Sequence, residues 1–140
     1  MKRFWLLVVL AVAVAACGEP RELAGFVRTP APSVATTSLP DVASGEQFDF
    51  VAPEDGLLLV YFGYTSCPDV CPTTLADVRT ALGRLGEDAD RVELVMATVD
   101  PDRDTPERLA HYVRWFNPRF LGANGSHGEL QGFTRQLGVM

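Results

Sequence analysis

Positive charge is scarce in this sequence. Its 140 residues carry 12 basic and 18 acidic side chains, which leaves a net charge of −6 at pH 7. Lysine occurs only once, at Lys2, and we interpret the preference for arginine as a compositional bias. Because a nucleic-acid-binding protein normally presents a basic face, this balance argues against that class, and we expect no nucleic-acid partner.

The sequence also lacks an apolar run long enough to cross a bilayer. The longest run, residues 4–16, falls short of the roughly 20 residues that a membrane-spanning helix needs. It follows Lys2 and Arg3 and ends in small residues before Cys17, which resembles the bacterial lipobox, whose cysteine is acylated and becomes the new N-terminus. We therefore expect a lipoprotein signal peptide at residues 1–16 and lipidation at Cys17. The alternative is a plain secretory signal in which Cys17 is incidental.

The next segment, residues 17–39, contains three prolines and little apolar periodicity. This composition is typical of an extended, solvated linker that holds a domain off a membrane surface. A leader without any spacing role is the alternative. The remaining residues, 40–140, are enough for one domain.

The pattern of that domain alternates strands and helices. Continuously apolar segments predict buried strands at residues 57–63, 91–99 and 120–121, preceded by a hairpin within residues 39–52. Apolar stripes at helical spacing predict three helices, which carry Leu75, Val78, Leu82 and Leu85; Leu109, Tyr112, Val113 and Phe116; and Leu130, Phe133 and Leu137. Gly86, Asn117 with Pro118, and Gly138 are their expected ends. The order β-β-β-α-β-α-β-α predicts an α/β fold with a parallel sheet and right-handed crossovers.

Two cysteines lie where the first buried strand gives way to its helix. Cys67 and Cys71 are four residues apart, and Pro72 suits the first turn of the helix. If this segment coils as the first helical turn, both sulfurs share one face, and the positive helix end favours thiolate. Two soft thiolates suit Cu(I), and the same pair can close into a disulfide.

Three other interpretations of this pair stay open: a structural disulfide, half of a zinc site, or two separate buried thiols. A disulfide that closes so short a loop contributes relatively little loop entropy. A structural zinc site takes four protein ligands, and the chain has no second pair of cysteines. The end of a parallel strand is where α/β proteins place reactive groups, which favours a functional pair.

Residues 61–75 (YFGYTSCPDVCPTTL) closely resemble the signature of the Sco/SenC family, and residues 99–106 (VDPDRDTP) resemble its second block. The resemblance runs from about Leu39 to the last residue. It implies a thioredoxin-like fold tethered to a membrane on the extracytoplasmic face of a bacterial cell. It also implies copper as the cofactor and Cys67 and Cys71 as its ligands.

The sequence departs from the family at its third ligand. The family has a histidine near a hairpin late in the domain, whereas this chain has only His111 and His127, and neither matches that position. We expect His111 to face solvent and His127 to lie in the loop at a helix start. Because the chain stops at Met140, we interpret it as a fragment or a truncated product with an incomplete thioredoxin-like fold that lacks the C-terminal strands and helix. Weaker copper affinity and an open, aggregation-prone sheet edge are expected in consequence.

Several other residues near these blocks have a possible role. Asp104 or Thr105 can cap the helix that begins at Pro106, and Asp104 with Glu107 has the spacing of a capping box. Asp100 is a candidate for a group that supports the cysteines from the next strand. Among the remaining candidates, Met96 is expected in the core, Met140 is only the last residue, and Tyr64 shelters the site or simply packs.

Two classes of function compete. The first is a metallochaperone that delivers copper to the dinuclear copper site of a cytochrome c oxidase subunit, with Cys67 and Cys71 as ligands. The second is a thiol-disulfide oxidoreductase that keeps the cysteines of that oxidase site reduced. A CxxxC spacing, one residue longer than the CxxC of thioredoxin-type reductants, favours copper. A peroxiredoxin-like enzyme is a distant third, and no small-molecule substrate is expected.

Overall fold

The computed structural model describes residue 25, residues 27–33 and residues 37–139. The chain divides into two units, Met1–Pro30 and Ala31–Met140. The predicted signal peptide, Cys17 and Met140 lie outside the described residues. Among the residues that are described, no helix has both the length and the apolar character needed to cross a bilayer.

The second unit opens with a short antiparallel hairpin, β1 (Ser38–Pro40) and β2 (Gln47–Asp49). The predicted hairpin is therefore confirmed, and β1 takes in the last two residues of the segment assigned to the linker. Val42 donates its N–H to the carbonyl of Gly122 at 2.9 Å, and an antiparallel bridge joins Asp41 to Ala123. These contacts place the hairpin beside the last strand of the main sheet.

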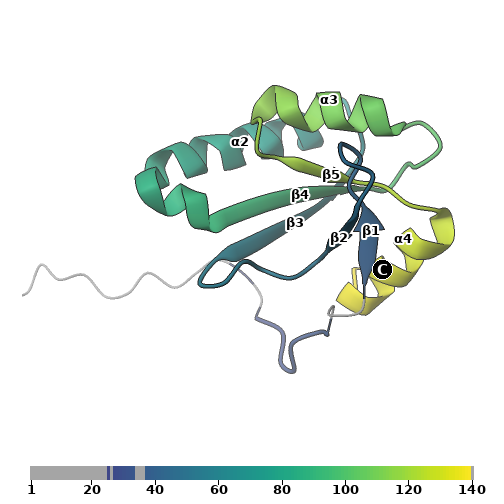
Figure 1. The fold of residues 1–140 in the computed structure, drawn as a ribbon, viewed down its shortest axis with the longest axis horizontal. Coiled ribbons are helices and arrows are strands. Elements are labelled where there is room, and N and C mark those ends of the chain that lie inside the picture. The colour runs from purple at the N-terminus through teal and green to yellow at the C-terminus, as the bar shows by residue number, and fades with distance from the viewer. Residues whose placement is uncertain (1–24, 26, 34–36, 140) are drawn as a thin grey trace, which may run out of the picture. The chain divides into compact units, whose positions relative to one another are not determined.

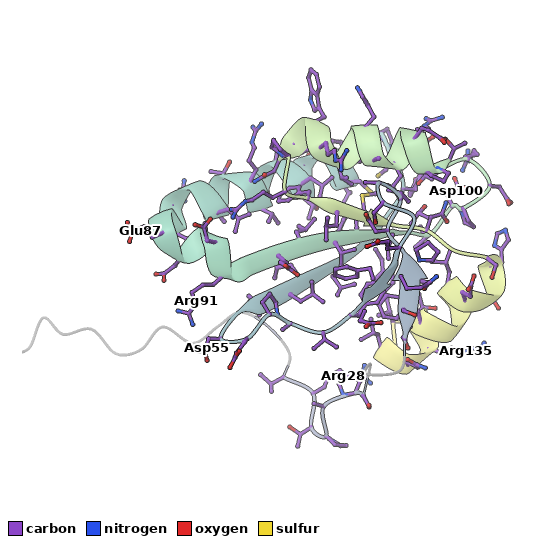
Figure 2. All side chains as sticks on the ribbon, viewed as in Figure 1. Arg28, Asp55, Glu87, Arg91, Asp100 and Arg135 are labelled. Atoms are coloured by element: carbon purple, nitrogen blue, oxygen red, sulfur yellow. The ribbon has the colours of Figure 1, made fainter. Side chains whose placement is uncertain are left out.

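The main sheet contains three parallel strands in the order β3-β4-β5 (Figure 1). They are β3 (Leu57–Gly63), β4 (Val92–Thr98) and β5 (Leu121–Ala123), with Leu57 opposite Val92. The three predicted strands are confirmed, with ends that differ by one or two residues. Their carboxyl ends all lie at one edge, where Figure 2 shows Asp100, whereas Asp55 and Arg91 lie at the opposite end of the sheet.

Helices cover both faces of the sheet (Figure 1). On one face lie α2 (Val70–Leu85) and α3 (Pro106–Phe116), and on the other lies α4 (His127–Leu137). The three predicted helices are confirmed, and Gly86 ends α2 with a positive φ of 60°. Leu85 was expected on the buried apolar stripe of α2, and this prediction was wrong. Its side chain is 48% exposed, because α2 runs past the edge of the core at its last turn. The sequence pattern also missed η1, a 3₁₀ helix at Gly86–Arg91.

Alternation along β4 divides the core into two layers, because successive side chains of a strand point to opposite faces. Leu94 and Met96 pack toward α2 and α3, whereas Val95 and Ala97 pack toward α4 and the hairpin. All four are at least 98% buried. Because both faces of β4 are covered, β4 is the central strand of the sheet. The cysteine loop lies at the carboxyl ends of the strands, next to the end of β4.

Candidate functional site

Cys67 lies in the turn that joins β3 to α2, and Cys71 is the second residue of α2. Cys67 donates its N–H to the carbonyl of Tyr64 at 3.2 Å, and the helix begins only at Val70. The expectation that Cys67 and Cys71 share the first helical turn is therefore wrong for Cys67, which precedes the helix. Pro72 does lie in the first turn, as predicted.

The two sulfurs nevertheless meet. The N–H of Cys71 points to Sγ of Cys67 at 3.4 Å, and the thiol of Cys71 and the N–H of Asp69 also donate to that sulfur. The side chain of Asp69, the residue at the N-cap position, makes no capping hydrogen bond. Sγ of Cys67 thus accepts an N–H that a helix leaves unpaired at its start. Both cysteines are free thiols.

The two thiols differ in accessibility and in acidity. Cys67 is partly exposed, and Cys71 is only 4% exposed. Hydrogen bonds from the Cys71 thiol and from the N–H groups of Cys71 and Asp69 lower the pKa of Cys67 to about 7, from an ordinary value of about 8.5. Burial raises the pKa of Cys71. Near neutral pH, Cys67 is therefore the sulfur that ionises, and Cys71 is its protonated donor.

Two tyrosine hydroxyls complete the surroundings of the sulfurs. Tyr64 makes a side-chain hydrogen bond to Cys67, and Tyr61 makes one to Cys71. The negative charge of Cys67 raises the pKa of Tyr64, and burial raises the pKa of Tyr61 to about 12. Both phenols thus stay protonated and can donate to sulfur. Tyr64 therefore does more than pack, because its hydroxyl contacts the Cys67 sulfur.

Close packing holds Cys71 against the strands. A methyl group at Gly63 would stand 2.8 Å from Cε1 of Tyr61, 3.0 Å from Cε of Met96 and 3.2 Å from Sγ of Cys71. Only glycine fits this point. Met96 is fully buried, as expected of a core residue, and its methyl group lies on the same side of the sheet as the Cys71 sulfur.

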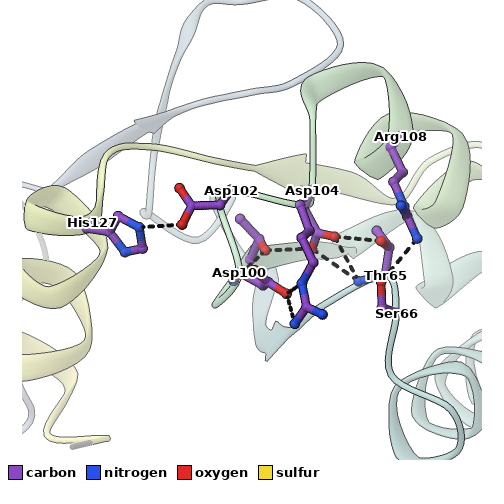
Figure 3. Close-up of polar contacts among 9 residues, drawn as sticks. Thr65, Ser66, Asp100, Asp102, Asp104, Arg108 and His127 are labelled. Atoms are coloured by element: carbon purple, nitrogen blue, oxygen red, sulfur yellow. Dashed lines mark hydrogen bonds and ion pairs between the residues drawn. The ribbon is translucent and has the colours of Figure 1, made fainter.

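The second sequence block reaches the cysteine loop through one aspartate (Figure 3). Asp104 is completely buried, and its carboxylate accepts hydrogen bonds from the N–H and hydroxyl of Thr65 and from the hydroxyl of Thr98. Of the two residues expected to cap α3, Thr105 does so, because it accepts the N–H of Arg108 at 3.3 Å. The capping role and the capping box considered for Asp104 are wrong. Asp100 stands at the end of β4 and pairs with the guanidinium of Arg103.

The histidines lie apart from the sulfurs. His111 is exposed on α3, and His127 is the first residue of α4, where its Nε2 lies 3.2 Å from a carboxylate oxygen of Asp102. Both positions agree with the sequence expectation. Within residues 37–139, no three side chains among histidine, cysteine, aspartate and glutamate form a cluster able to hold a metal ion.

Sequence reasoning missed Tyr61, Thr65 and Thr98 as neighbours of the site. Tyr61 carries a usable signal, because it lies two residues before Gly63 and side chains two apart in a strand share a face. Thr98 is the next-to-last residue of the second predicted strand, residues 91–99, and so belongs to the carboxyl end of the sheet. The contact between Thr65 and Asp104 has no local signal, because the two residues are 39 apart in the chain.

A parallel α/β sheet with an exposed, acidic cysteine and a buried partner at the start of a helix defines a thioredoxin-like dithiol protein. The family model for SCO1/SenC matches residues 26–140, and the chain belongs to that family. The thioredoxin-like fold and the Sco/SenC assignment expected from the two sequence blocks are thereby confirmed. The SCO2-like protein of Rickettsia felis is 38% identical over 96 residues, which are 69% of this chain and 47% of the relative.

Solved structures show the same fold. The structure of Bradyrhizobium japonicum ScoI with copper bound is 35% identical, with a TM-score of 0.65 over 72% of this chain and 64% of that one. A second neighbour, BsSco, is described as having a disulfide switch and as a member of the Sco family of cytochrome c oxidase assembly proteins. At 18% identity and a TM-score of 0.59, it supports the fold alone. The chain thus spans less than half of the curated relative and under two thirds of the copper-bound structure.

Proposed function

We propose that this chain is a copper-binding protein of cytochrome c oxidase assembly and that Cys67 and Cys71 are its copper ligands. The observation that carries the proposal is the contact between two free thiols at the start of α2. Thiolates are soft donors and select Cu(I) over harder ions. Membership in the SCO1/SenC family and similarity to ScoI with copper bound support the same conclusion.

The donor set fits copper as a cargo. Cys67 ionises near neutral pH, so one ligand is available without a large proton cost. Cys71 is buried and keeps its proton more firmly, so metal binding has to displace that proton. Affinity is therefore expected to rise with pH, and a bound ion is expected to be held from one side by the loop and from the other by the helix.

The place of action is also part of the proposal. Lipidation at Cys17 and a linker over residues 17–39 would tether the domain to the extracytoplasmic face of a bacterial membrane. The partner would be the oxidase subunit that holds the dinuclear copper site. Asp100, close to the end of β4, is proposed as a supporting residue through its ion pair with Arg103.

Copper titration of the reduced protein against a competing Cu(I) chelator tests the ligand assignment. We expect about one copper ion per chain, and we expect Cys67→Ser and Cys71→Ser each to abolish binding at chelator concentrations that the unmodified protein tolerates. His111→Asn and His127→Asn are matched controls and should retain copper. Stoichiometric copper in the Cys67→Ser, Cys71→Ser double variant would contradict the assignment.

A thiol-disulfide oxidoreductase is the second candidate. Such an enzyme needs one accessible thiol with a low pKa as the attacking group and a second thiol beside it, and Cys67 and Cys71 have these properties. The Cys67 thiolate would attack a disulfide of a partner and release one partner thiolate, which takes up a proton. Cys71, after losing its proton, would then attack Sγ of Cys67 and release the second thiolate. This chain ends as a disulfide, and the partner gains two electrons. Its two thiolates take up the proton that Cys71 lost and one proton from solvent.

Trapping separates the two candidates. With Cys71→Ser, a mixed disulfide between Cys67 and an oxidase copper-site subunit should accumulate under mild reduction, whereas Cys67→Ser should give none. A metallochaperone without reductase activity would yield no adduct with either variant and would still bind copper when both cysteines are present. Copper binding and adduct formation are thus read independently.

A further inference from the structure

The buried carboxylate of Asp104 forms no ion pair with any of the described residues, and it accepts hydrogen bonds from two separate segments. Thr65 donates its N–H at 3.1 Å to Oδ2 and its hydroxyl at 2.5 Å to Oδ1, and Thr98 donates its hydroxyl at 2.6 Å to Oδ2. Asp104 is completely buried. A buried carboxylate is stable only when hydrogen bonds replace its lost water, so these donors are required by the fold.

The two donor segments are the ones that frame the dithiol. Thr65 lies two residues before Cys67 in the loop after β3, and Thr98 ends the neighbouring strand β4. Asp104 itself stands just before α3, where Asn124 donates its side-chain N–H to the carbonyl of Asp104 at 2.8 Å. The carboxylate therefore joins the cysteine loop to β4 (Figure 3). The carbonyl joins the same residue to the segment after β5.

A second, weaker hydrogen bond also joins the cysteine loop to the start of α3. Arg108, one helical turn after Asp104, donates from Nη2 to the hydroxyl of Ser66 at 3.1 Å. Both groups of this pair are exposed, so water competes for the hydrogen bond. Two consecutive loop residues, Thr65 and Ser66, are thus held from the start of α3, and the buried contact is the one expected to dominate.

We propose that Asp104 is a positioning residue for the dithiol: its carboxylate fixes the loop at Thr65 so that Sγ of Cys67 stays within reach of the N–H groups at the start of α2. Without this tie, the loop gains freedom and the sulfur loses those donors. The inference deepens the proposed function, and it rests on that function only for copper affinity. The reactivity of the metal-free thiol tests it separately.

Alkylation of the reduced, metal-free chain at neutral pH is the decisive measurement, followed by mass spectrometry with fragment ions that separate Cys67 from Cys71. Asp104→Asn keeps the size of the side chain but replaces an acceptor by an N–H₂ group that faces the Thr65 or Thr98 donors. We expect Cys67 to react about tenfold more slowly, because a loop released at Thr65 no longer holds its sulfur against the N–H of Cys71 at the start of α2. An unchanged rate in folded Asp104→Asn would overturn the proposal.

Threonine variants cover the case in which Asp104→Asn fails to fold. Thr65→Val and Thr98→Val conserve shape, and each removes one donor from the carboxylate; both should slow Cys67. Thr134→Val is the matched control, since it removes a buried hydroxyl that donates to Gln131 on α4, far along the chain from the loop. If Thr134→Val slows the alkylation of Cys67 as much as Thr65→Val does, the effect reflects a general loss of stability. That result would overturn the proposal.

Two further readings complete the test. Thr65→Val combined with Asp104→Asn should slow Cys67 no more than Asp104→Asn alone, because both changes remove one interaction; full additivity would contradict the tie. Asp104→Asn should also weaken Cu(I) binding by about tenfold, as is typical of residues that orient metal ligands. If the unmodified chain binds no copper while the alkylation results hold, the proposed function fails and the positioning role stands.

Discussion

At Gly63, side chains of β3, β4 and α2 approach the backbone closely. A Cβ there would lie within 3.2 Å of Tyr61, Met96 and Cys71, and none of these can move freely because all three are packed in the core or at the site. Gly63→Ala is therefore expected to lower the free energy of unfolding by about 1–3 kcal/mol. Urea denaturation measures this loss, and alkylation of Cys71 should become faster as its packing loosens.

Gly83 provides the matched control for that substitution. It lies in α2 with open space around its Cα, so an added methyl group meets nothing within 4 Å. Gly83→Ala is expected to raise the free energy of unfolding by up to about 1 kcal/mol, because alanine is the better helix former. Opposite signs for the two substitutions would establish that the close approach at Gly63 is specific; equal effects would contradict it.

The acidity of Cys67 predicts the pH dependence of its reactivity. Only the thiolate is alkylated, so the rate should rise with pH, reach half its maximum near the pKa of about 7, and level off above it. Burial raises the pKa of Cys71, so Cys71 should react at higher pH and more slowly. Tyr64→Phe removes one donor to the Cys67 sulfur and should shift the Cys67 midpoint upward. A single midpoint shared by both cysteines would contradict the assigned asymmetry.

At the scale of the helix, two adjacent residues at the start of α3 have different roles. Thr105 caps the helix, and Asp104 is proposed to position the cysteine loop. Thr105 accepts the N–H of Arg108, and Ser126 with Glu129 forms a full capping box at α4. Thr105→Ala is expected to lower the free energy of unfolding by about 1 kcal/mol, a typical loss for a helix N-cap. Thermal or urea unfolding measures it, with Ser126→Ala as a comparison of similar size.

The same Thr105 variant also tests the role of its neighbour. Thr105 and Asp104 are adjacent in the chain, but only Asp104 contacts Thr65. Thr105→Ala should therefore destabilise the protein without slowing the alkylation of Cys67. A slowing comparable to that of Asp104→Asn would show that any damage at the start of α3 reaches the cysteine loop.

At the scale of the whole molecule, the edge of β3 that faces away from β4 is where we expect association to occur. In the described part of the chain, β3 pairs only with β4, and its seven residues are apolar apart from the tyrosine hydroxyl. An exposed apolar edge strand offers unpaired N–H and carbonyl groups to a second molecule. The aggregation expected from the sequence therefore stays a prediction for this 140-residue chain, with β3 as its site.

Leu57→Lys tests that prediction. Leu57 is the first residue of β3 and is 53% exposed, so a lysine there places a charge on the edge with little change in stability, within about 0.5 kcal/mol. Light scattering at increasing protein concentration should show weaker association. Leu85→Lys, at a similarly exposed apolar residue at the end of α2, is the control and should change association little; an equal effect would assign association to general hydrophobicity.

The strands, the three α-helices and their order could be predicted from the amino-acid pattern alone, whereas η1 could not. Strands β3 and β4 carry continuous apolar runs, and the helices carry stripes at helical spacing, so local periodicity was sufficient to place both kinds of element. The position of Cys67 and Cys71 between a strand and a helix followed from the same pattern. Together with the two motif blocks, this was enough to indicate the family and to single out the two sulfurs.

The difference between the two sulfurs, and the contacts that hold them, depend on how the chain folds in three dimensions. The unequal burial of Cys67 and Cys71, the hydroxyl of Tyr61 at the buried sulfur, and the contact of Asp104 with Thr65 join segments that are distant in the chain. Such contacts depend on the register of β3 against β4 and on where α3 begins. Periodicity reports which face of an element is apolar, and it carries no information about which distant atom that face will meet.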